Sequence, residues 1–61
     1  MTTDTACWQS IATLAAQAPA NRTGMAIWEA FRMWDSAHPD AGAEDAQAAY
    51  ERIRRLFGVA A

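Results

Sequence analysis

Apolar residues recur every three or four positions in three successive segments of the chain, and Pro19 and Pro39 separate those segments. This spacing places apolar side chains on one face of an α-helix. No segment shows the alternation of apolar and polar residues that marks a half-buried strand. The sequence therefore predicts an all-α protein with three short amphipathic helices, at about residues 4–18, 22–37 and 40–57.

The first segment combines a narrow apolar stripe with a polar face that carries no charge. Thr3 or Asp4 is expected to cap its start, because either side chain can accept a hydrogen bond from a free backbone N–H. The opposite face is neutral, so a partner could cover it at a lower desolvation cost than a charged face. An ordinary solvent-exposed face is the simpler interpretation. The stripe consists of Cys7, Ile11, Leu14 and Ala18, with Trp8 and Ala15 beside it.

The second segment is the most apolar, and Asn21 or Thr23 is expected to cap it. A helix with so wide an apolar arc usually contacts two neighbours. We therefore expect it to be the central helix of a helical hairpin or three-helix bundle. The arc consists of Ala26, Ile27, Ala30, Phe31, Met33, Trp34 and Ala37.

Two large apolar residues of this segment project outside the arc. Met25 falls on the polar side, and Trp28 falls beside Asp35. Tryptophan and arginine are enriched at the energetic centres of protein interfaces, and methionine adapts to varied surfaces. One interpretation is a partner-binding face, and the other is that Trp28 closes over the first helix as an edge of the core. The residues predicted to bind a partner are Met25, Trp28, Arg32, Trp34 and Asp35.

The third segment is amphipathic, with its charges ordered along its length. Acidic residues come early and arginines late, which complements the dipole of a helix. Gly58 is placed to end the helix as the C′ residue. The expected buried stripe is Ala46, Ala49, Tyr50, Ile53, Leu56 and Phe57.

Length and composition limit the class of protein. The chain has 61 residues and predicts one small helical domain, with 52% hydrophobic residues and a net charge of −2. It is too apolar for a disordered tail, and no stretch is long enough to cross a membrane. The single cysteine excludes an internal disulfide. With no basic leader at its start, the chain is expected to be cytoplasmic.

Six aromatic residues are a heavy load for a core of this size. A domain of about 60 residues buries only about 60% of the surface of its unfolded chain. Such domains often gain stability from disulfides, metals or self-association. With the first two disfavoured by the sequence, we expect a bundle completed by homodimerisation, by docking on a larger protein, or by both.

Residues suited to catalysis or metal binding are few and scattered. His38 is the only histidine and Cys7 the only cysteine. Because Cys7 lies on an apolar stripe, we expect a buried, inert thiol, and we expect His38 beside Pro39 to be a loop or capping residue. No zinc-ligand spacing, EF-hand or phosphate-binding loop is present. The sequence therefore predicts no enzyme, no catalytic residue, no metal site and no cofactor.

Nucleic-acid binding is the main alternative to protein binding. Two helices joined by a short break resemble a helix-turn-helix in outline. However, the start of the third helix is acidic, which disfavours phosphate, and the whole chain is acidic. The residues that a dimer could still use for this purpose are the late arginines, Arg52, Arg54 and Arg55.

The sequence thus favours a small, non-enzymatic protein-interaction module. It would bind and modulate a larger protein through an aromatic helix face, as an inhibitor or anti-activator, including one carried by a phage or mobile element. A dimeric nucleic-acid-binding regulator and a structural small subunit of an enzyme complex are the alternatives.

Overall fold

The computed structural model describes residues 2–59, and within them the chain forms three α-helices and one turn of 3₁₀ helix. The elements are α1 (Thr3–Gln17), η1 (Ala20–Arg22), α2 (Thr23–Ala37) and α3 (Ala43–Leu56). No strand occurs in this part of the chain. The all-α prediction is confirmed, whereas completion of the fold by a second copy stays a prediction.

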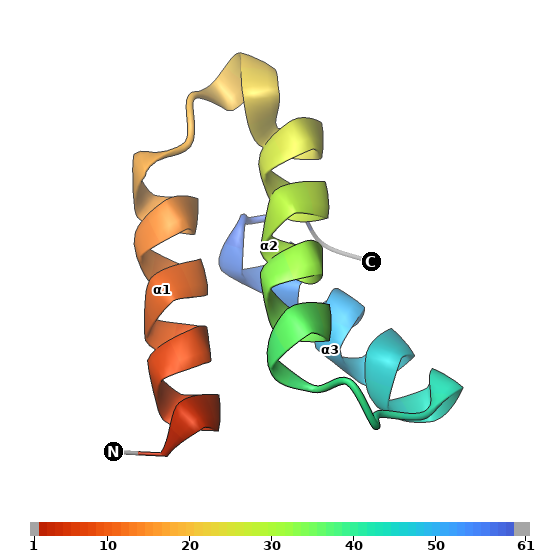
Figure 1. The fold of residues 1–61 in the computed structure, drawn as a ribbon. Helices are drawn as coiled ribbons and strands as arrows, with labels where there is room; N and C mark the ends of the chain where they lie inside the picture. The colour runs from red at the N-terminus through yellow and green to blue at the C-terminus, as the bar shows by residue number, and fades with distance from the viewer. Residues whose placement is uncertain (1, 60–61) are drawn as a thin grey trace.

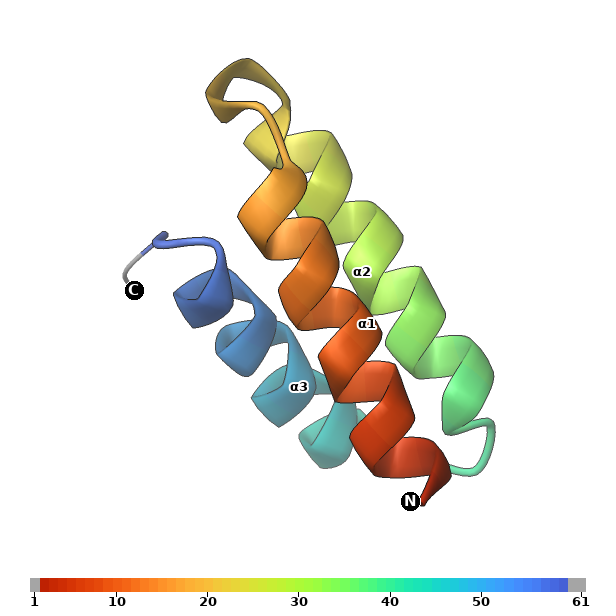
Figure 2. The same cartoon turned by 90° about the vertical axis from the view of Figure 1, so that its left-hand side faces the viewer.

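The helices form an antiparallel hairpin with a third helix laid against one side (Figures 1 and 2). α1 and α2 lie side by side, and α3 packs against both of them. The result is flat, with dimensions of 32 × 25 × 15 Å. As its wide apolar arc predicts, α2 is the central helix, because its core-facing residues meet α1 on one flank and α3 on the other.

The core is small and consists mainly of residues from α2. Among residues 2–59, the large side chains that are 5% exposed or less are Ile11, Trp34 and Ile53. Several half-buried side chains close the core's edges, including Cys7, Trp8 and Phe31. The buried residues are Ile11, Ala26, Ile27, Ala30, Trp34, Ala49 and Ile53.

Two of the expected helix starts are wrong. Thr2 caps α1, because its hydroxyl accepts a hydrogen bond from the Thr5 N–H at 3.1 Å, and Asp4 lies inside the first turn. Neither Asn21 nor Thr23 caps α2. A cap needs extended backbone, but η1 runs directly into α2 and Thr23 already has helical backbone angles.

The third helix starts three residues later than the pattern predicts. Pro39 disfavours helical backbone at His38, which adopts φ −131° and ψ 63°. A turn then forms, closed by a hydrogen bond from the Ala41 N–H to the His38 carbonyl at 3.1 Å. Gly42 remains extended, so α3 begins only at Ala43. This turn reverses the chain and directs α3 back along the hairpin.

The end of α3 matches the predicted glycine cap. Gly58 has φ 77°, a left-handed conformation that glycine adopts without strain. Its N–H donates to the Arg55 carbonyl, and the Val59 N–H donates to the Arg54 carbonyl. These two bonds form a Schellman motif. Val59 then folds back against the core, which fixes the last described turn of the chain.

The expected stripe of α3 is only partly covered. Ala49 and Ile53 are buried, but Tyr50 is 40% exposed and Leu56 is 43% exposed. The flat arrangement places two helices against α2 and leaves this side of α3 without a neighbour. The apolar stripe of α3 is therefore only partly buried in the folded chain.

Candidate functional site

The largest apolar side chains outside the core lie on the outer face of α2. Met25 is 72% exposed and Trp28 is 61% exposed, the two highest values among the large hydrophobic residues described. Both lie roughly opposite the buried positions 27, 30 and 34, because a helix turns about 100° per residue. A hollow of about 710 Å³ lies over this surface, here named the outer α2 face. It is lined by Gly24, Met25, Trp28, Glu29, Arg32, Met33 and Ser36.

Arg32 is held against the exposed indole. Its guanidinium carbon lies 5.0 Å from the centroid of the Trp28 ring, within the range of a cation–π contact. The ring is therefore oriented by its own helix, and one of its faces is partly covered by a cation. Tryptophan and arginine are both enriched at interface hot spots.

The aromatic surface continues from α2 towards α3. Phe31, one turn after Trp28, meets Tyr50 edge to face with ring centroids 5.8 Å apart. Arg54 lies over the Tyr50 ring at 5.8 Å from its centroid. Tyr50, which the sequence pattern assigns to the core, therefore extends the exposed aromatic surface. The sequence pattern determines on which face of a helix a residue lies, but it does not determine how much of that side chain a neighbouring helix buries.

The predicted partner-binding residues do not all lie on this face. Met25, Trp28 and Arg32 do, and Asp35 is exposed nearby on the same helix. Trp34 is different, since it is 5% exposed and belongs to the core. It lies within the apolar arc that meets α1 and α3, so it supports the fold and cannot anchor a partner from the surface.

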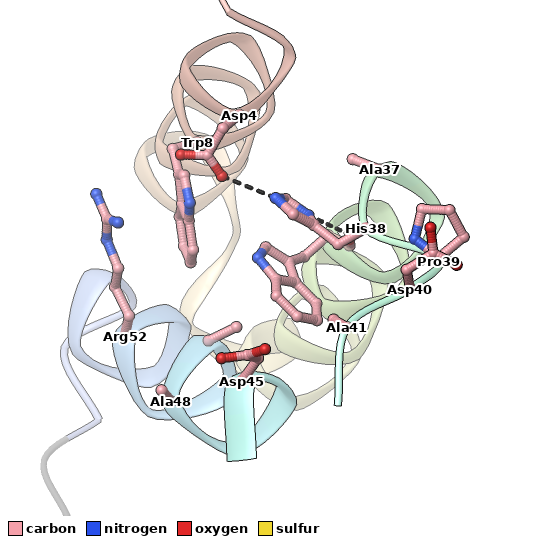
Figure 3. Close-up of a pocket in the computed structure, with 12 residues that line it drawn as sticks. Asp4, Trp8, Ala37, His38, Pro39, Asp40, Ala41, Asp45, Ala48 and Arg52 are labelled. Carbon is pink, nitrogen blue, oxygen red and sulfur yellow. Dashed lines mark hydrogen bonds and ion pairs between the residues drawn. The ribbon is translucent and has the colours of Figure 1, made fainter. Parts of the chain in front are cut away.

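The second hollow, of about 580 Å³, opens at the end of the bundle where α1 begins and α2 ends (Figure 3). We call it the helix-end cleft. Its aromatic walls are Trp8, Trp34 and His38, and its charged residues are Asp4, Asp40, Asp45 and Arg52. The Arg52 guanidinium carbon lies only 4.0 Å from the centroid of the Trp8 ring, which bridges α3 and α1 across the opening.

His38 ties the two ends of the hairpin together. Its Nε2 lies 2.8 Å from Asp4 Oδ1, and its Nδ1 lies 2.9 Å from the Trp34 carbonyl oxygen. Both partners accept hydrogen bonds, so this geometry favours the ring that carries a proton on each nitrogen. The hydrogen bond to the Trp34 backbone, followed by the one to Asp4, raises the pKa of His38 above its ordinary value of 6.5.

The cleft's residues do not assemble a reactive group. With both ring nitrogens engaged, His38 is not free to remove a proton from a substrate. Cys7 lies outside the cleft, with its sulfur 3.9 Å from the Met33 carbonyl oxygen. Burial, and then the charge of Asp4, raise the pKa of the Cys7 thiol above 9.0, which disfavours the reactive thiolate. Within residues 2–59, no cluster of three or more His, Cys, Asp or Glu is placed to hold a metal ion.

The three late arginines turn in different directions. Arg52 lies over Trp8 on one side of α3, while Arg54 lies over Tyr50 on the other. Arg55 is exposed between them. Two of the three guanidinium groups therefore contact aromatic rings of the same chain, on different sides of α3. Nucleic-acid binding by these arginines stays a prediction.

No described helix has the length and hydrophobicity required to cross a lipid bilayer. When the chain is compared with protein-family models, curated proteins and solved structures, nothing matches it. The functional assignment therefore depends on the chain's own surfaces.

Proposed function

We propose that this chain is a non-enzymatic protein-interaction module that binds its partner through the outer α2 face. The observation that carries the proposal is the exposure of Met25 and Trp28, 72% and 61%, on the helix that otherwise supplies most of the core. Leaving large apolar side chains in water forgoes hydrophobic stabilisation, which burial against a second protein would recover.

The chemistry of the face defines the kind of partner. Trp28 and Met25 require an apolar groove, while Arg32 and Glu29 require groups of opposite charge at its rim. An interface with an aromatic anchor, an arginine beside it and a polar border has the usual anatomy of a protein–protein contact. Modulation then takes place by occlusion, because the bound module covers the partner's groove. If that partner is an enzyme, the module is its small subunit or its inhibitor.

Site-specific photo-crosslinking tests this proposal. A benzophenone amino acid replaces Ser36, which lines the face but leaves Trp28 and Met25 intact, and the full chain is expressed in its own cells. A matched control carries the same group at exposed Gln47 on α3. We expect one defined adduct from position 36 and none from position 47. The mass of the adduct separates a second copy, at twice 6.6 kDa, from a different protein.

The captured complex is then titrated with the purified proteins. Trp28→Ala is expected to weaken binding about 30-fold, which corresponds to a hot spot of about 2 kcal/mol. Gln47→Ala is expected to have no effect. The proposal fails if neither position yields a defined adduct, or if both substitutions change the affinity equally.

A further inference from the structure

The charged residues of the outer α2 face are ordered so that the face can pair with the same face of a second copy. Met25, Glu29, Arg32 and Ser36 follow one another at spacings of four, three and four, which aligns them along the helix as the seam of a helix pair. Trp28 lies on one flank of this seam and Met33 on the other. All six residues are exposed except Met33, which is half-buried.

The two charges at the middle of the seam, Glu29 and Arg32, do not form an ion pair with each other or with another described residue. Within residues 2–59, the ion pair between His38 and Asp4 is the only one that forms. Neither Glu29 nor Arg32 takes part in an ion pair in this part of the chain, and Arg32 contacts the Trp28 ring instead. Both charges remain available to another molecule, although they lie beside the most exposed apolar side chains of the chain.

Two α2 helices can face each other in two directions, and the charges distinguish between them. In a parallel pair, Glu29 faces Glu29 of the partner subunit and Arg32 faces Arg32 of the partner subunit, so like charges repel. In an antiparallel pair centred between positions 30 and 31, Glu29 faces Arg32 of the partner subunit. The twofold axis repeats that ion pair, and it also places Met25 against Ser36 of the partner subunit, twice.

The exposed surface of the chain also favours a second copy. The accessible surface is 4357 Å². A typical folded monomer of the same mass exposes about 3,900 Å². The isolated chain thus leaves several hundred square ångströms more than usual in water, on the order of what one side of the smallest stable interfaces buries. A second copy seated on the outer α2 face would cover part of this exposed area in both chains.

We propose that the outer α2 face is the interface of a homodimer in which the two α2 helices run antiparallel, paired through Glu29 and Arg32. This inference rests on the proposed function, because it names a second copy of the chain as the partner of the same face. The twofold axis places both Trp28 rings on one flank of the seam and both Met33 side chains on the other, where they exclude water from its ion pairs. The Arg32 guanidinium serves both its own Trp28 and the opposing carboxylate.

Charge reversal tests the pairing and its direction. Glu29→Arg and Arg32→Glu each place like charges together, and each is expected to raise the dimer dissociation constant about tenfold or more. The double variant, Glu29→Arg with Arg32→Glu, restores opposite charges across an antiparallel pair, and the dimer is expected to return. An equimolar mixture of the two single variants is expected to form a heterodimer. Glu51→Arg, an exposed reversal on α3, serves as the control and should leave the dimer intact.

Light scattering over a concentration series measures each mass, and circular dichroism confirms that each variant is folded. A wild-type chain that stays monomeric up to about 100 µM overturns the inference, since stable small interfaces reach micromolar affinity. So do single variants that dimerise like the wild type, or a double variant that stays monomeric. If crosslinking at position 36 instead yields a different protein, the proposed function survives and the homodimer alone is rejected.

Discussion

Trp28 and Trp34 lie on the same helix, less than two turns apart, but the tertiary structure buries Trp34 and leaves Trp28 exposed. Trp34 is 5% exposed, stacks on His38 with centroids 4.5 Å apart, and packs in the same cluster as Ile11 and Ile53. Trp28 is 61% exposed, and its recorded partner is Arg32 on its own helix. One indole therefore holds the helices together, while the other is free to hold a second molecule.

Under the proposed function, this difference separates the residues that stabilise the fold from those that bind a partner. The core draws on one face of α2 and on the half-buried edges of α1 and α3. On the outer face of the same helix, Met25 and Trp28 lie largely in solvent, so these two side chains can change with little effect on the fold. We therefore expect substitution of Trp34 to lower the stability of the fold, and substitution of Trp28 to weaken binding.

The largest expected effect is loss of stability on removing the inner indole. Trp34→Ala is expected to lower the free energy of unfolding by about 3–5 kcal/mol, because the cavity cannot be filled by its neighbours. A domain of this length has only about 3–9 kcal/mol in total, so the variant is expected to be partly or wholly unfolded. Urea denaturation followed by circular dichroism measures the change. Trp34→Phe retains much of the ring and should remain folded; equal stability of the alanine variant and the wild type would contradict the assigned core.

The matched change at the outer indole is expected to affect binding and leave the fold intact. Trp28→Ala should change the free energy of unfolding of the monomer by about 0.5 kcal/mol or less, since exposed positions away from other contacts tolerate substitution. Its dimer dissociation constant should rise about 30-fold. Denaturation is extrapolated to low protein concentration, because dimerisation adds to apparent stability. A loss as large as that of Trp34→Ala would place Trp28 in the core.

Fluorescence quenching provides a direct measure of the two environments. In variants that keep only one tryptophan, with phenylalanine at the other two positions, acrylamide should quench Trp28 more strongly than Trp34. Raising the protein concentration should protect Trp28 as the dimer forms and leave Trp34 unchanged. Quenching of Trp28 that does not respond to concentration would argue against its burial between copies.

The smallest expected effect is a pH dependence of stability, which comes from the hydrogen bonds of His38 to Asp4 and to the Trp34 carbonyl. Because the folded pKa of His38 is raised, its stabilising contribution is fully present below its ordinary pKa of about 6.5 and is lost as the pH rises through the folded value. The wild type should lose stability between pH 6 and pH 8 relative to Asp4→Asn. Denaturation at both pH values measures this; identical pH dependence in the two proteins would show that the Asp4 contact is not formed.

Much of the fold follows from local sequence pattern. The three apolar stripes, the central position of α2 and the glycine cap at Gly58 all depend on residues within a few positions of one another. The helix starts were less predictable, because Thr2 and Gly42 compete with nearby residues that are equally able to cap. The Asp4–His38 contact, which spans 34 positions, leaves no trace in local spacing.

The candidate site was partly predictable for the same reason. Met25 and Trp28 stand outside the apolar arc of α2, and that periodicity alone places them away from the core. Trp34 lies inside the arc, so its assignment to a partner surface conflicted with its own position. Tyr50 could not be assigned correctly from the pattern, because its exposure depends on whether another helix covers that side of α3.

The sequence alone determined that the chain is helical, which residues share a face of each helix, and that the outer α2 face orders its charges symmetrically. These properties arise from the fixed rise and turn of the α-helix. Only the tertiary structure decided which faces are covered, which arginine meets which ring, and which of two tryptophans is left in water. Those outcomes depend on how three helices share a limited apolar area, which no single segment encodes.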